Sequence, residues 1–421
     1  MSELRRRGTR LLLLRLTRNA RSRFDVLSNR NFRLFVGGQV TSAVGTWMMI
    51  ATQDWLILEW TNNSPVALAI ATMCQFGPAL MIPFGVGYLA DRFPKRTLLI
   101  CVNTASVFVT TIQALSVLSG AADVWHLWVF AACLGVLNSI ETPTRMAFVG
   151  EIVGDRDFRA ASSLSAMYFS AAQLLGPAIA GILIALAGPG TALTINVVTY
   201  IATIAGLAAM KPGDITTHHI KPERLDATRG IRRILADPEL SRAVALLVGV
   251  GLLALNLRTT APLLARTEFN ATPTLFGMVT ASIAAGSLCA ALMVGGHGTP
   301  TLRTALTAAA VLGLAELALG FASNLLIAMT LLVVCGAAMT TFLQSTNHQL
   351  QLATNPNDRT HVIAVYAAIV QGVAPMAALA LAFLIQFAEI RVVLSGGGAI
   401  TVCVVGAMYL NYRRARHSLL V

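Results

Sequence analysis

The sequence predicts an all-α membrane protein with twelve transmembrane helices arranged as two pseudo-symmetric six-helix bundles. Three observations support this fold class: a composition that is 56% hydrophobic and 12% charged, a series of membrane-length apolar segments, and an internal repeat. Soluble domains contain about 25% charged residues, and a bilayer-spanning helix needs about 20 apolar residues. The expected spans are residues 33–59, 66–89, 97–119, 125–148, 160–187, 190–210, 243–265, 274–296, 302–322, 325–350, 361–387 and 391–412.

The net charge of +12 is distributed in a way that predicts membrane topology and argues against nucleic-acid binding. Ten arginines lie in residues 1–33, and further basic residues occupy alternate loops, with seven between Lys211 and Arg242. The intervening loops lack lysine and arginine except for Arg266 and Arg391, each of which has an acid nearby. By the positive-inside rule, both termini and the basic loops are expected in the cytoplasm, against anionic lipid head groups.

An internal repeat divides the spans into two halves. Three residues of span five recur in span eleven after 198 residues, and the pairs are Tyr168 and Tyr366, Gln173 and Gln371, and Pro177 and Pro375. The match predicts a six-plus-six duplication in which the two glutamines face each other across a pseudo-twofold axis. The expected segments are an Arg-rich cytoplasmic segment (1–32), two bundles (33–210 and 243–412), a cytoplasmic linker (211–242) and a basic tail (413–421).

Span one carries the first candidate functional residues. Gln39, Ser42, Thr46 and Gln53 fall on one face of a helix, and such a polar stripe is expected to face the bundle interior or water. Asp54 lies beside this stripe, still within the apolar run. A carboxylate inside a bilayer costs at least ~2.5 kcal/mol on insertion scales, so Asp54 is expected to have a partner or a function. The alternative is an interfacial carboxylate that reaches water.

Other ionisable residues also fall inside predicted spans. Arg258 in span seven lies at a depth close to that of Asp54, and Glu316 lies in span nine. Glu141 and Arg145 are four residues apart near the cytoplasmic end of span four, a spacing that allows them to pair on one helix face. The alternative is that Glu141 reaches an arginine of the turn between spans two and three.

That turn is short and highly charged. Residues 87–97 read Gly-Tyr-Leu-Ala-Asp-Arg-Phe-Pro-Lys-Arg-Thr, with four charges between Asp91 and Arg96, and must lie in water at one membrane face. Other motifs are missing from the sequence: it contains no phosphate-binding loop, no zinc-ligand spacing among its six cysteines and no hydrolase motif. No cofactor, metal or enzymatic activity is therefore expected.

The twelve spans, the repeat, the cationic linker and this turn together resemble the major facilitator superfamily of transporters. The turn is similar to the family signature G-x-L-A-D-R-x-G-R-K/R at Gly87, Leu89, Ala90, Asp91, Arg92 and Arg96, with Pro94 in place of the usual glycine. Residues 175–181, Leu-Gly-Pro-Ala-Ile-Ala-Gly, are similar to the span-five motif of the antiporter branches. Segments 29–60 and 143–181 most resemble the drug:proton antiporter group that includes the enterobactin exporter.

The resemblance implies two bundles that rock about a central cavity. It implies that Asp91 docks at the positive start of span eleven. With Arg92 or Arg96 reaching Glu141, this contact would latch the cytoplasmic side in the outward-open state. The group's usual second arginine before span eleven is His361 here, which weakens one latch contact or makes it pH-sensitive. The remaining gating candidates are Gly87, Arg145, Gly176 and Pro177.

The predicted function is proton-coupled export of a hydrophobic or amphipathic small molecule by alternating access, by a monomer in the cell membrane. Asp54 is the first candidate for the proton-coupling carboxylate, pairing with Arg258 between the halves in the outward-closed state, and Glu316 is the second. The other cavity candidates are polar residues expected near the centre: Gln39, Thr46, Gln53, Tyr168, Gln173, Gln344, Tyr366 and Gln371.

Two rival hypotheses stay open. The first keeps the fold and changes the cargo, to a dedicated siderophore or lysolipid exporter or flippase. An anionic siderophore needs fixed cations in the cavity, and because Arg258 is the one candidate, the sequence argues mildly against this rival. The second and more remote rival is a membrane-embedded transferase, which requires paired carboxylates or an acidic metal site in a loop.

Overall fold

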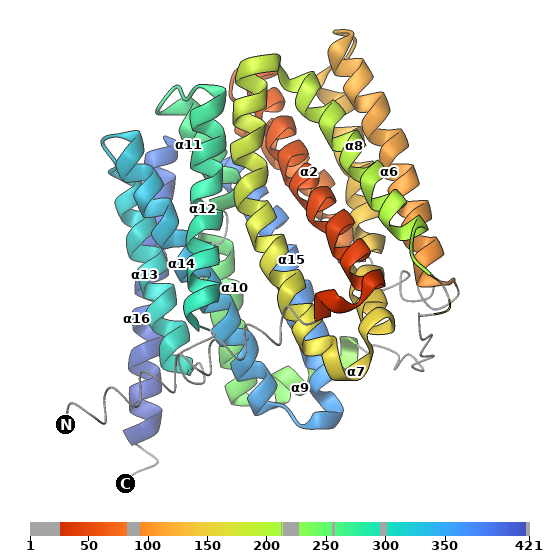
Figure 1. The fold of residues 1–421 in the computed structure, drawn as a ribbon. Helices are drawn as coiled ribbons and strands as arrows, with labels where there is room; N and C mark the ends of the chain where they lie inside the picture. Colours follow the sequence, from red (N-terminus) through yellow and green to blue (C-terminus); the bar gives the residue numbers. More distant parts are fainter. Residues whose placement is uncertain are drawn as a thin grey trace, which may run out of the picture.

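The computed structural model of the protein describes residues 26–81, 93–211, 213, 227–254, 257–294 and 301–417, and every regular element in these ranges is a helix. Figure 1 shows the helices packed side by side along one direction. They are η1 (Val26–Ser28), α2 (Arg30–Trp60), α3 (Pro65–Phe76), α4 (Pro78–Met81), α6 (Lys95–Leu118), α7 (Val124–Ala187), α8 (Pro189–Ala208), α9 (Ala227–Ala236), α10 (Pro238–Ala254), α11 (Leu257–Thr267), α12 (Pro273–Val294), α13 (Leu302–Gly320), α14 (Leu325–Ala353), α15 (Pro356–Leu384) and α16 (Ile390–His417).

The helices agree closely with the predicted spans. Eleven stretches of the described residues are long and apolar enough to cross a bilayer. The shorter apolar stretch Pro65–Leu80 stands where span two is predicted, and the rest of that span falls in residues 82–92, outside the described part. The expectations for Gly87, Asp91 and Arg92 therefore concern residues that the structure does not describe.

Helix α7 contains two predicted spans, four and five. The chain turns back between Val124–Gly154 and Asp157–Ala187. At the turn, Gly154 has φ of 70° and ψ of 175°, a backbone conformation that favours glycine because a Cβ would clash there. The turn therefore depends on this residue.

The predicted linker 211–242 contains more helix than expected. Helix α9 lies within it, and α10 begins at Pro238 rather than at residue 243. Helix α9 packs against the start of α15, where Arg229 Nη2 lies 2.7 Å from Asp358 Oδ1. An apolar pattern of membrane length could not reveal α9, because this short helix is anchored by polar contact with α15.

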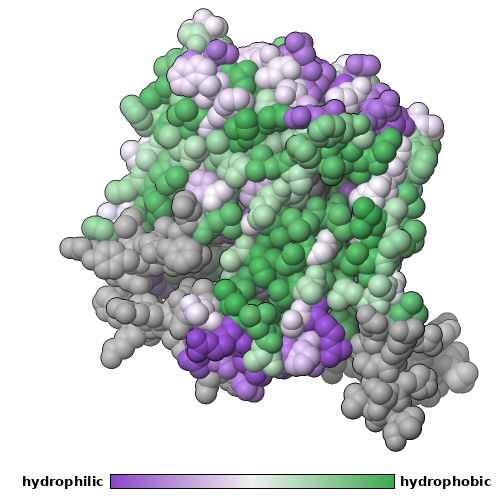
Figure 2. Space-filling model, turned by 180° about the vertical axis from the view of Figure 1, so that it is seen from behind, coloured by the Kyte–Doolittle hydropathy of each residue, from purple (hydrophilic) through white to green (hydrophobic). Residues whose placement is uncertain are grey.

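The two ends of the bundle can be named from the chain direction. We call the end of the bundle where α2 starts and α16 finishes the terminal end (Figure 1). The opposite end, where α2 finishes and α16 starts, is the far end. Hydrophobic residues cover the middle of the surface in Figure 2, with hydrophilic residues above and below. Such an apolar band is what contact with the hydrocarbon core of a bilayer requires.

The two halves of the chain are in tight contact towards the far end. Gly181 in α7 lies against α12, and the Cα of Gly277 is 3.1 Å from where a Cβ on Gly181 would stand. The hydroxyl oxygens of Thr72 in α3 and Thr259 in α11 are 3.4 Å apart. Small residues let helix backbones approach closely in a membrane, so these positions allow the two halves to close against each other.

Candidate functional site

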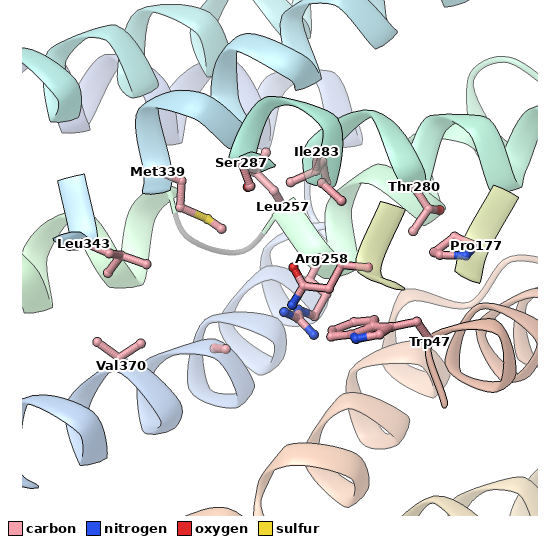
Figure 3. Close-up of a pocket in the computed structure, with 13 residues that line it drawn as sticks. Trp47, Pro177, Leu257, Arg258, Thr280, Ile283, Ser287, Met339, Leu343 and Val370 are labelled. Carbon is pink, nitrogen blue, oxygen red and sulfur yellow. The ribbon is translucent and has the colours of Figure 1, made fainter. Parts of the chain in front are cut away.

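A cavity of about 190 Å³ lies between the two halves, near the middle of the helices that line it (Figure 3). Helices α2 and α7 supply one wall, and α11, α12, α14 and α15 supply the other. Its lining is mostly apolar, and Arg258 is the one charged side chain in the described lining. The lining residues are Trp47, Gln173, Pro177, Leu257, Arg258, Thr280, Ile283, Ala284, Ser287, Met339, Leu343, Val370 and Ala374.

Arg258 reaches from the second half of the chain onto aromatic rings of the first half. Its Cζ lies 4.6 Å from the ring centroid of Trp47 and 4.9 Å from that of Phe76. Figure 3 shows the guanidinium beside the indole of Trp47. The side chain is exposed although it lies well inside the span, which means that it faces the cavity. Because an aromatic face attracts a cation, this contact holds the two halves together.

Asp54 is buried close to this arginine. Its side chain is 7% exposed, and the carboxylate interacts electrostatically with Arg258. The expected ion pair is absent: the four ion pairs found within the described ranges do not join these two residues. The guanidinium turns to the aromatic rings instead, so direct pairing with Asp54 requires a movement of Arg258.

The polar stripe of span one faces the interior of the first half rather than the cavity. Gln53 accepts a hydrogen bond of 2.9 Å from Gln75, and the hydroxyl oxygen of Thr46 lies 3.2 Å from that of Tyr200. Gln39 is also buried, and it accepts a hydrogen bond of 3.4 Å from Arg145. Gln39, Thr46 and Gln53 are not among the residues that line this cavity, and the Nε2 atoms of Gln39 and Gln53 are buried without a hydrogen-bond partner among the described residues.

The tyrosines and glutamines of the later spans are also displaced from the cavity, with one exception. Gln173 lines it as predicted, whereas Tyr168 and Tyr366 are buried, each 8% exposed. Gln344 and Gln371 are exposed and are not among the residues that line this cavity. Their neighbours Leu343 and Val370 line the cavity instead, since one residue along a helix rotates the side chain by about 100°. The predicted face-to-face arrangement of Gln173 and Gln371 is not formed around this cavity.

The gating candidates that the structure describes make other contacts than the latch. Arg96 donates hydrogen bonds of 2.9 Å and 3.0 Å to the carbonyls of Leu207 and Ala208, at the end of α8. Within the described ranges neither Arg96 nor Arg145 forms an ion pair with Glu141. The latch is expected when the terminal end is closed, and in this structure the tight contact is at the far end.

Gly176 and Pro177 lie where α7 meets the cavity. A Cβ on Gly176 would stand 2.9 Å from the backbone nitrogen of Met48, so α7 and α2 touch closely there. Pro177 lines the cavity one residue later. A gating role for Gly176 and Pro177 stays a prediction, and the close approach of the two helices is compatible with it.

Glu316 occupies a different environment from Asp54. It is 2% exposed in α13, and its Oε2 has no hydrogen-bond partner among the described residues. Helix α13 packs on α14 and α16 and supplies no residue to the cavity lining. Glu316 is therefore buried within the second half rather than between the halves.

Sequence reasoning missed the wall supplied by α12. Thr280, Ala284 and Ser287 line the cavity, and their spacing of four and three residues places them on one helix face. Small and weakly polar residues at this spacing were a usable signal. It was hidden because such residues are common in membrane helices for packing reasons.

The fold and this central cavity define a multi-pass membrane transporter rather than an enzyme. The chain belongs to the major facilitator family described as transmembrane secretion effector, whose model matches residues 21–418. The membership confirms the superfamily predicted from the charged turn and the repeat, and it implies a small-molecule substrate.

Two curated relatives match part of the chain. One is the staphyloferrin A transporter of Staphylococcus aureus (strain NCTC 8325 / PS 47), 26% identical over 162 residues, which are 38% of this chain and 41% of the relative. The other is the uncharacterized MFS-type transporter YfiS of Bacillus subtilis (strain 168), 25% identical over 161 residues, 38% of this chain and 37% of the relative. Each match thus spans about two fifths of the relative's length.

Solved structures share the fold across most of the chain. A POT family transporter in complex with a thioalcohol-conjugated peptide has a TM-score of 0.70 at 11% identity, covering 91% of this chain and 96% of its own. A bacterial homologue of the iron transporter ferroportin, in an inward-facing state, has a TM-score of 0.69 at 13% identity, covering 90% and 98%. At these identities the likeness concerns the fold alone.

Proposed function

We propose that the protein is a secondary active transporter that exports hydrophobic or amphipathic small molecules from the cell in exchange for protons. In this proposal it acts as a monomer in the plasma membrane with both termini in the cytoplasm. The terminal end then faces the cytoplasm, as the distribution of arginines favours. Helix contacts at the far end close the route to the outside, so a solute would enter the cavity from the cytoplasmic side.

One observation carries this proposal: a largely apolar cavity between the halves whose described wall has one cation, Arg258, and a buried carboxylate within electrostatic reach of that cation. Apolar walls with a few polar groups suit an amphipathic ligand. Burial favours the neutral form of a carboxyl group and a nearby arginine favours the charged form. Movement of Arg258 towards or away from Asp54 would therefore change the proton affinity of Asp54, which is the requirement for coupling.

The latch belongs to the same proposal. When the terminal end closes, Asp91 would dock at the start of α15, and Arg92 or Arg96 would reach Glu141. To reach Glu141, Arg96 would have to break its two hydrogen bonds to carbonyl oxygens at the end of α8. The free-energy cost is small, because other charge-assisted hydrogen bonds would replace them. His361 is buried at the start of α15, the helix end at which Asp91 would dock.

The experiment is transport by purified protein in proteoliposomes with an imposed pH gradient. The panel contains neutral lipophilic drugs, lipophilic cations and ferric-ion chelators that carry several carboxylates. We expect accumulation of at least one amphipathic member that collapses when a protonophore dissipates the gradient. Transport that is unaffected by the protonophore, with a gradient of another ion driving it, would contradict proton coupling.

A second candidate, a dedicated siderophore exporter, is favoured by two specific observations. Arg258 is a fixed cation inside the cavity, and one relative is a staphyloferrin A transporter. In the same liposome panel this function predicts transport of carboxylate chelators with no competition from neutral drugs, whereas the drug-type function predicts mutual competition.

A further inference from the structure

Spans one and seven carry tryptophans and arginines at matching intervals. Trp47 and Trp55 are eight residues apart on α2, and Arg258 and Arg266 are eight residues apart on α11. Each arginine lies over one tryptophan: the Cζ of Arg258 is 4.6 Å from the ring of Trp47, and the Cζ of Arg266 is 4.3 Å from the ring of Trp55. The two contacts form successive rungs between the halves, about 12 Å apart at 1.5 Å per residue.

The upper rung, Arg266 on Trp55, is enclosed by further contacts at the far end. Trp55 is 4% exposed, its Nε1 donates to Glu59 at 3.1 Å, and its ring meets Phe276 edge-on at 5.3 Å. The Nε of Arg266 donates to Asn63 at 3.2 Å. Residues of both halves thus surround this rung, and it closes the far end without lining the cavity.

The lower rung, Arg258 on Trp47 and Phe76, is open to an occupant of the cavity. Trp47 and Arg258 line the cavity, and Arg258 is exposed to it. The Cζ of Arg258 lies over the rings of Trp47 and Phe76, and an aromatic ring accepts no strong hydrogen bond from the N–H groups of a guanidinium. A guanidinium offers five donors in a planar fork that matches a carboxylate or phosphate.

The charged residues at the cavity favour a ligand whose charge has the opposite sign. Its described lining contains Arg258 and no acidic residue, since Asp54 is buried outside the lining. A second cation stands nearby: Arg145 lies 5.3 Å from the ring of Phe169, which in turn meets Trp47 at 6.0 Å. Arg258 attracts an anionic group in the cavity and repels a cationic one, and the buried Asp54 opposes this effect only while its carboxyl group is charged.

We infer that the lower rung is the binding site for the anionic head of an amphipathic solute, and that occupation draws the guanidinium of Arg258 off Trp47 and Phe76. Charge-assisted hydrogen bonds to an oxyanion are stronger than the cation–π contact that they replace. Among the described residues, loss of the lower rung leaves the upper rung as the remaining cation–π contact between α2 and α11, so the loaded protein opens at the far end more readily. The inference rests on the proposed function in that a solute enters the cavity, and it is independent of proton coupling.

Three probes with one apolar body and different charge test the site: 1-naphthaleneacetate (anion), 1-naphthalenemethanol (neutral) and 1-naphthylmethylammonium (cation). Equilibrium binding is measured to the full-length protein in nanodiscs of zwitterionic lipid, with no gradient imposed and empty nanodiscs as the blank. We expect the anion to bind at least tenfold more tightly than either of the other two probes. Equal binding of the three probes, or tightest binding of the cation, overturns the inference.

Variants of the two rungs form a matched pair. Arg258→Gln should abolish the preference for the anion, and Arg258→Lys, which keeps the charge without the planar fork, should retain part of it. Arg266→Gln removes an arginine from the same helix, away from the cavity, and should leave the preference intact. A loss of preference in Arg266→Gln as large as in Arg258→Gln would show that the anion does not bind at the lower rung.

Closure of the far end is read by cross-linking. Thr72→Cys and Thr259→Cys, in a chain whose six native cysteines are replaced, place two thiols where the hydroxyl oxygens are 3.4 Å apart. We expect 1-naphthaleneacetate to slow disulfide formation severalfold and the other two probes to leave it unchanged. An unchanged rate with saturating anion would overturn the link between binding and opening. Because this experiment uses no gradient, a negative result would not contradict proton-coupled transport. A failure of proton-coupled transport in proteoliposomes would likewise not contradict anion binding at the lower rung.

Discussion

Asp54 and Glu316 are both buried carboxylic acids inside membrane spans, yet their surroundings differ in kind. Asp54 lies near the boundary between the two halves, within electrostatic reach of an arginine from the other half. Glu316 lies inside the second half, on a helix that supplies no residue to the cavity lining. A rocking motion of rigid halves changes the environment of the first acid and leaves that of the second nearly constant. If the halves rock as proposed, burial alone does not identify a coupling residue, and position relative to the interface between the halves does.

The largest effect is expected at Asp54. In Asp54→Asn the side chain keeps its shape and can no longer exchange a proton, so gradient-driven transport should fall at least about tenfold, equivalent to ~1.4 kcal/mol. Exchange of labelled for unlabelled solute without a gradient should continue, because it needs no net proton movement. Both rates are measured in the same proteoliposomes, and full gradient-driven transport by this variant would remove Asp54 from the mechanism.

The next effect is expected at Gly181, where the two halves touch. In Gly181→Ala the added methyl group would meet the backbone of α12, including the Cα of Gly277 at 3.1 Å, and overpacking of this kind costs about 1–3 kcal/mol. The cost falls on the arrangement with a closed far end, so the rate of cross-linking between positions 72 and 259 should drop severalfold. Gly37→Ala in α2 is the control, because nothing lies within 4 Å of the added methyl.

A contact inside one half should affect stability and spare transport. Arg391 in α16 pairs with Glu268 at 2.5 Å and donates to the carbonyl of Ala322 at 2.9 Å, which ties three segments of the second half together. Both side chains are partly exposed, at 30% and 23%, so the loss in Glu268→Gln should be about 0.5–1 kcal/mol. Thermal unfolding in detergent measures it, and a loss of transport with unchanged stability would place this pair in the transport cycle instead.

The smallest effect is expected at Glu316. In Glu316→Gln a neutral group of the same shape replaces the carboxyl, and gradient-driven transport should stay within about twofold of the parent, equivalent to ~0.4 kcal/mol. The comparison with Asp54→Asn is direct, since both changes are isosteric and both sites are buried. If the two variants exchanged their outcomes, Glu316 would be the coupling acid and the distinction between interface and interior would not hold.

The sequence alone determined the class of fold and the positions of most helices. Hydrophobic stretches of membrane length are a local property, and each predicted span is matched by a helix in the described chain, with span two described in part. The charged turn and the repeat predicted the superfamily to which the chain belongs.

Only the tertiary structure decided which side chains meet in the cavity. Gln39, Thr46 and Gln53 form a polar stripe whose face is visible in the sequence, but the hydrogen-bond contacts of the three residues lie inside the first half. The contact of Arg258 with Trp47 joins residues 211 positions apart on separate halves. Periodicity shows which residues share one helix face, but it does not show how that helix is rotated relative to its neighbouring helices. That rotation is set by packing among all the helices, which is why the cavity could be expected from the sequence while most of its walls could not.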